Sequence, residues 1–114
     1  MIYEIVITGD TNDADYTTRT NDITQEQLDR FMPLIEAIKA YTKKNKFRHN
    51  WPVSEYCGGE SPEKLYPQFA GEPKEDEDDE PTGLIGEFME FVPWDIHSIE
   101  SIVYYPKPVK TVLL

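Results

Sequence analysis

The chain has 114 residues and a formal net charge of −11 at pH 7, with 22 acidic and 11 basic residues. This length is typical of one domain with one hydrophobic core, so we predict a single domain over residues 1–114. The single cysteine excludes an internal disulfide and favours a reducing, cytoplasmic setting, and the lack of an apolar run of ~20 residues argues against a membrane partner.

The first elements form a predicted hairpin. Residues 2–9 are rich in β-branched and aromatic side chains, which predicts a strand that ends at a Gly-Asp pair. Residues 10–15 have a turn composition, and the threonine-rich residues 16–20 predict a second strand at the edge of the sheet. The face of the first strand expected to enter the core holds Tyr3, Ile5 and Ile7.

A long amphipathic helix is predicted to follow. Thr24 and Gln27 have the spacing of a capping box, in which each side chain bonds to the other residue's backbone N–H. Apolar residues then recur every three or four positions over residues 28–41, and Asn45 is a reasonable terminator. Pro33 interrupts the helical hydrogen bonding but not this periodicity, so we expect a kink rather than an end.

The middle of the chain is less regular. Residues 46–51 are compatible with a short strand, and Ser61-Pro62 is a typical helix start. We predict only a turn or two of helix there, because Pro67 follows. Residues 71–82 are predicted to be a flexible acidic loop.

The C-terminal third predicts one more helix and two strands. Residues 83–92 fit a short helix, and residues 97–105 and 109–114 fit strands separated by a Pro-Lys-Pro turn. The whole pattern predicts an α+β fold. We expect a small two-layer domain, in which an antiparallel sheet of about four strands packs on one long amphipathic helix, with one or two short helices beside it.

The loop at residues 10–15 is a candidate cation site. Its carboxylates, from Asp10, Asp13 and Asp15, are the oxygen ligands that calcium and magnesium prefer. The pattern is not an EF-hand, because Ala14 occupies the fifth position, where that motif needs a ligand. A small-ligand or divalent-cation-binding domain is therefore one alternative function, against the simpler interpretation of a loop built from turn formers.

Cys57, His49 and His97 are the residues suited to soft-metal binding or thiol chemistry. They lack the paired spacing of zinc ligands, and no base stands at a recognisable spacing from the cysteine. A lone cysteine is most often a small buried hydrophobe. We therefore expect neither a cofactor nor an enzyme.

Two charged segments are candidate partner-binding sites. The first interleaves cations with an aromatic ring, although the −11 charge of the whole chain argues against direct binding to nucleic acid. Its cations also suit the negative end of the helix dipole, which is the simpler interpretation. The residues of this basic segment are Lys43, Lys44, Lys46, Arg48 and Trp51.

The second segment is acidic and holds seven carboxylates and one lysine within residues 72–80, a local charge of −6. Such a run is often a solvated linker, but it also offers a dense row of carboxylates to a basic partner surface. Its acids are Glu72, Glu75, Asp76, Glu77, Asp78, Asp79 and Glu80.

Residues 5–16, with Thr8-Gly9-Asp10 at their centre, and residues 99–106 resemble segments of small acidic proteins encoded by bacteriophages. The resemblance implies no catalytic residues. It implies a protein that acts in the host cytoplasm and modulates a host factor, including one that binds nucleic acid. We therefore predict a small acidic protein-interaction module whose partner is a basic protein surface, with an oligomeric structural or accessory protein as a further alternative.

Overall fold

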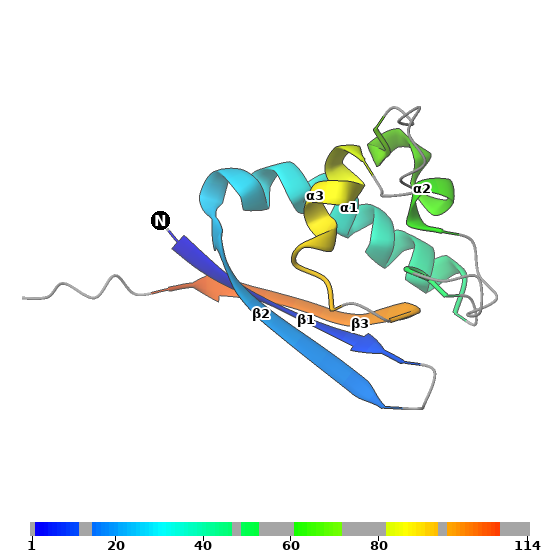
Figure 1. The fold of residues 1–114 in the computed structure, drawn as a ribbon, viewed down its shortest axis with the longest axis horizontal. Coiled ribbons are helices and arrows are strands. Elements are labelled where there is room, and N and C mark those ends of the chain that lie inside the picture. Colours follow the sequence, from blue (N-terminus) through cyan, green and yellow to red (C-terminus); the bar gives the residue numbers. More distant parts are fainter. Residues whose placement is uncertain are drawn as a thin grey trace, which may run out of the picture.

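The computed structural model describes residues 2–11, 15–46, 49–52, 61–71, 82–93 and 96–107. In these ranges the fold is α+β, with one antiparallel sheet and all helices on one side of it (Figure 1). The two-layer arrangement of a long helix on an antiparallel sheet is confirmed.

The sheet has the strand order β2-β1-β3, with β1 (Ile2–Asp10) between β2 (Tyr16–Thr24) and β3 (Ser98–Pro106). The prediction that the second strand lies at an edge is therefore confirmed. β2 is longer than the predicted segment of residues 16–20, because Ile23 pairs with Tyr3 and is buried. Three strands lie in the described part of the chain, and the predicted fourth strand at residues 109–114 lies outside it.

The long helix α1 (Gln25–Lys44) begins and ends as predicted. Thr24 Oγ1 accepts a hydrogen bond from the Gln27 N–H at 3.1 Å, and Gln27 Oε1 accepts one from the Thr24 N–H at 3.1 Å. This capping box satisfies N–H groups that have no partner within the helix. Pro33 lies inside α1, which continues through it, and Asn45 is the C-terminal cap.

Two of the short helices agree with the sequence, namely α2 (Pro62–Leu65) and α3 (Gly83–Met89). The 3₁₀ helix η2 (Pro67–Phe69), which begins at the proline expected to end α2, was not predicted. The strand considered for residues 46–51 is not observed at Lys46 or at residues 49–52. None of the helices in the described ranges is long and apolar enough to cross a membrane.

The core lies between the sheet and the helices. Ile5 and Ile7 of β1 are fully buried, as their alternation predicts. They face the apolar stripe of α1. Phe31 of this stripe packs edge-to-face against Phe88 of α3, with the two ring centroids 5.2 Å apart. The buried residues of α1 are Leu28, Phe31, Leu34, Ile35 and Ile38.

The other side of the sheet, which we call the open face, carries none of the helices in the described ranges (Figure 1). Cross-strand pairs place Val6 on this face between Thr20 of β2 and Val103 of β3. Next to them, the Tyr105 hydroxyl donates a hydrogen bond to Glu4 Oε2 at 2.6 Å. The open face is therefore a mixed surface with an apolar centre.

Candidate functional site

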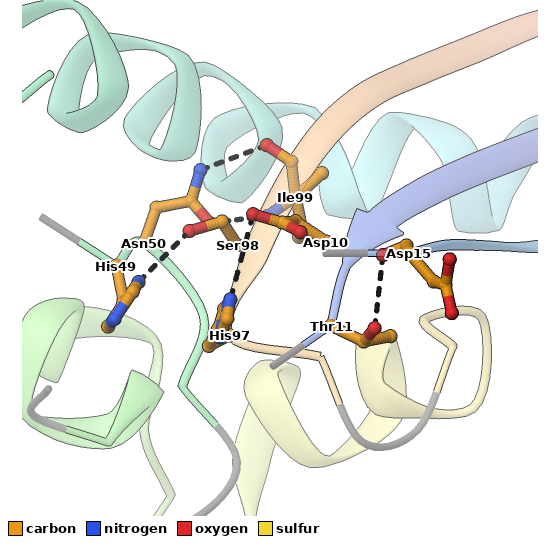
Figure 2. A network of polar contacts seen from close by, with 8 residues as sticks. All are labelled: Asp10, Thr11, Asp15, His49, Asn50, His97, Ser98 and Ile99. Atoms are coloured by element: carbon orange, nitrogen blue, oxygen red, sulfur yellow. Dashed lines mark hydrogen bonds and ion pairs between the residues drawn. The ribbon is translucent and has the colours of Figure 1, made fainter. Parts of the chain in front are cut away.

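A polar cluster lies where β1 ends and β3 begins (Figure 2). His97 Nε2 lies 3.6 Å from Asp10 Oδ2, and the His97 backbone N–H donates to the Asp10 carbonyl at 3.0 Å. The His97 side chain is almost completely buried, whereas the Asp10 carboxylate is one-third exposed. The carboxylate therefore orients a buried imidazole from the solvent side.

A second imidazole lies against the first one. The His49 ring stacks on His97 with centroids 4.3 Å apart, and His49 Nδ1 lies 3.4 Å from the Ser98 hydroxyl oxygen. Asp10 orients His97, whereas Ser98 contacts His49, so these contacts form two separate pairs. A serine hydrolase needs one imidazole between the carboxylate and the hydroxyl. The cluster lacks that arrangement.

The contact between His49 and His97 was not predicted from the sequence, because 48 positions separate the two residues and no short motif contains both. Cys57, the third residue suited to soft-metal binding or thiol chemistry, lies outside the described residues.

The predicted cation loop is only partly described. Asp10 pairs with His97, and the exposed Asp15 accepts two hydrogen bonds from Thr11 through its backbone carbonyl. Asp13 lies outside the described residues. Within the described ranges, no group of three or more His, Cys, Asp or Glu side chains is placed to hold a metal ion.

The basic segment divides into surface and core residues. Lys43 and Lys44 are exposed in the last turn of α1 and Lys46 is exposed beyond it, whereas Arg48 lies outside the described residues. The placement of Trp51 corrects its selection as a partner contact. Its side chain is 0% exposed, and its ring centroid lies 5.6 Å from that of Phe88. An indole buried this completely contributes to the core and offers no surface to a partner.

Asn50 explains why this segment enters the core. Its side-chain oxygen accepts a hydrogen bond from the Ile99 N–H at 2.6 Å, and its amide nitrogen donates to the Ile99 carbonyl at 3.1 Å. The same nitrogen also donates to Thr42 Oγ1 at 2.8 Å. Asn50 therefore joins β3 to the end of α1 without forming a strand, since one side chain satisfies both backbone groups of Ile99.

The Tyr66 hydroxyl completes this connection by donating to the Asn50 carbonyl at 3.0 Å. Burial raises the pKa of Tyr66 above its usual 10.0, and the neighbouring Tyr41 raises it further. A tyrosine with a raised folded-state pKa contributes its full stability below the unfolded pKa and loses it as the pH rises through the ionisation.

We therefore expect the free energy of unfolding to fall as the pH rises above about 10. Tyr66→Phe should cost about 1 kcal/mol at neutral pH, because one hydrogen bond is lost, and should flatten the alkaline decline. Urea unfolding at a series of pH values measures both effects. Tyr16→Phe is the control, since Tyr16 is 66% exposed. An equally steep alkaline decline in Tyr66→Phe would contradict the assignment.

The acidic run at residues 72–80 lies outside the described residues, but the two chain segments that flank it are described. Ala70 and Gly83 form an isolated antiparallel bridge, and the Gly71 N–H donates to the Thr82 carbonyl at 3.1 Å. We call these four residues the closed stem. The two chain segments on either side of residues 72–81 therefore lie side by side.

The two glycines allow this close contact. A Cβ atom on Gly83 would lie 2.4 Å from the Gly71 nitrogen, and one on Gly71 would lie 2.5 Å from the Gly83 nitrogen. Gly83 also has a φ of 71°, in the left-handed region that side chains disfavour. The stem therefore requires glycine on both strands of the bridge.

The charge of the chain is unevenly distributed along the sequence. The described residues carry 11 acids and 8 bases, a net charge of −3, whereas residues 72–80 alone carry −6. Some surface charges of the folded part are also paired, such as Arg30 with Glu87 at 2.6 Å. The described part is therefore close to neutral, and more than half of the net charge lies in residues 72–80.

No protein family, curated protein or solved structure matches this chain. The resemblance to bacteriophage proteins therefore stays a prediction.

Proposed function

We propose that the protein is an interaction module that presents its acidic loop, residues 72–80, to a basic surface on another protein. The closed stem is the observation that carries this proposal. A linker between separately placed elements has no need of joined ends, whereas a loop held at its base projects from one point of a fixed body. The stem therefore supports a presented loop over a simple linker.

The charge distribution supports the same proposal. A nearly neutral body adds little long-range repulsion or attraction, so a loop of charge −6 would dominate the approach of a charged partner. Carboxylates in a dense row suit a surface rich in Lys and Arg, including a surface that otherwise binds the phosphates of nucleic acid. A phage protein that modulates such a host factor is one form of this proposal.

A matched pair of variants tests the loop. Glu75, Glu77 and Glu80 are changed to Gln in the loop variant, and three exposed acids of the folded part are changed to Gln in the control. These are Glu26, Glu36 and Glu90. The two variants have the same net charge, so a difference between them reports the position of the carboxylates.

The immobilised wild-type chain should capture basic proteins from a lysate at low salt and release them at high salt, because exposed charges are screened. The loop variant should lose these proteins while the control keeps them. The most abundant captured protein, once purified, should bind the loop variant at least tenfold more weakly by calorimetry. Equal affinities of the two variants for this protein would refute the proposal.

A further inference from the structure

Within the described residues β3 is an edge strand, and the hydrogen-bonding groups of its outer edge can be assigned. The Lys107 N–H donates to the Ile2 carbonyl at 2.8 Å, and bonding alternates along an antiparallel pair. Val103 therefore directs its N–H and C=O towards β1, whereas Ile102 and Tyr104 direct theirs outward. The backbone groups of Pro106 also point away from β1, so its missing N–H removes no hydrogen bond from the sheet.

Residues 101–105 of this edge lack the usual protection against pairing, whereas the register shift beside them leaves Glu100 without a partner in β1. Natural edge strands carry charges, bulges or prolines that prevent contact with another strand. Residues 101–106 contain no charged side chain, and their one proline lies at the end. Val103, Tyr104 and Tyr105 are 52%, 38% and 43% exposed. The opposite edge strand, β2, carries Arg19 and Asp22.

A groove runs along β3 on the side of the helices. It has a volume of about 410 Å³ and lies between α1 and β3, where its apolar lining includes Ile38, Ile99 and Ile102. Tyr104 is on this same side of the sheet, because it pairs with the buried Ile5. Each molecule therefore carries an apolar groove and, two residues further along the same strand, a partly exposed aromatic ring.

We propose that two copies of this chain pair through β3 in antiparallel orientation, with the two-fold axis at Val103. This register places Ile102 of one copy opposite Tyr104 of the other. The outward groups of these residues then exchange two hydrogen bonds on each side of the axis. The two sheets join into one sheet of six strands.

The second copy suits this surface by its shape. The register lays Tyr104 of each copy beside Ile102 of the other, at the groove, so ring and groove complement each other across the two-fold axis. Lys107 pairs with Asp22 at 2.8 Å on the open face, whereas Glu100 lines the groove on the helix side, so the contact depends on shape rather than on charge.

Charge at the axis tests the proposal in the full chain. Val103→Glu places two carboxylates directly opposite each other in the dimer, which destabilises a cross-strand pair. Thr20→Glu is the matched control, because Thr20 and Val103 flank Val6 on the open face from opposite edges. By sedimentation equilibrium, the wild type and Thr20→Glu should dimerise, and Val103→Glu should dimerise at least fivefold more weakly.

An equimolar mixture of Val103→Glu and Val103→Lys should restore a 1:1 dimer, which a misfolded variant could not form. A wild-type monomer at millimolar concentration would overturn the proposal, and so would dimers that Val103→Glu leaves unchanged or Thr20→Glu weakens equally. The loop variant described above should dimerise like the wild type, so the two proposals fail separately.

Discussion

Replacing Asn50 with leucine should lower the free energy of unfolding by about 3 kcal/mol, although leucine has a similar size. The side chain of Asn50 is the partner of both the N–H and the C=O of Ile99, and Asn50 is only 2% exposed. Leucine would leave two buried backbone groups without a hydrogen bond, and each costs about 1–3 kcal/mol. Urea unfolding of the wild type and the variant measures this difference.

Thr42→Val is the comparison variant. It removes the Thr42 hydroxyl, which accepts from the Asn50 amide at 2.8 Å and donates to the Ile38 carbonyl at 2.8 Å, and it leaves the pairing of Asn50 with Ile99 in place. We expect a loss of about 1 kcal/mol for this variant. If Asn50→Leu were as mild as Thr42→Val, the contact with Ile99 would not be the main role of Asn50.

Gly83→Ala should lower the free energy of unfolding by about 2–3 kcal/mol. Two physical costs add up at this position. The left-handed backbone is unfavourable for alanine, and the new methyl group would meet the backbone nitrogen of Gly71 at 2.4 Å. Because this nitrogen is a backbone atom, it cannot rotate away as a side chain could. The bridge between the two segments must therefore open to relieve the contact.

Two measurements locate this effect. Thermal unfolding gives the loss of stability, and hydrogen exchange should show faster exchange of the Gly71 N–H, which donates to the Thr82 carbonyl. Gly86→Ala is the control within the same helix, α3, and should be neutral or stabilise by up to about 1 kcal/mol. Unchanged exchange of Gly71 in Gly83→Ala would mean that the stem does not depend on Gly83.

The parts of the fold that sequence predicted well depend on neighbours in the chain. The capping box of Thr24 and Gln27 involves residues three positions apart, and the burial of Ile5 and Ile7 follows from alternation within one strand. Such patterns are visible in a short window because the interacting groups lie in that window.

The parts that sequence missed depend on residues far apart. Asn50 and Ile99, which are 49 positions apart, join the end of α1 to β3, and His49 and His97 stack at the same place. Trp51 lies a few residues after Lys46 and Arg48 and directly before Pro52, a local sequence typical of a surface loop. The hydrogen bonds between Asn50 and Ile99 hold this segment in the core, and no local sequence pattern predicts a contact between residues so far apart.

The acidic loop shows the same limit. Its composition was evident from the sequence, as was the presence of a glycine on either side of it. The contact between Gly71 and Gly83 could not be predicted from their spacing, because the eleven residues between them are compatible with many distances between their ends.

The closed stem has a consequence for how this protein changes over evolutionary time. The entropy of closing a loop rises by only about 0.6 kcal/mol for each doubling of its length, provided that its ends stay together. Insertions, deletions and wholesale replacement between Gly71 and Thr82 therefore leave the sheet and the helices largely undisturbed. The stem makes this position a natural graft site, where a new recognition sequence, or a small domain with adjacent termini, can be exchanged without redesign of the body that carries it.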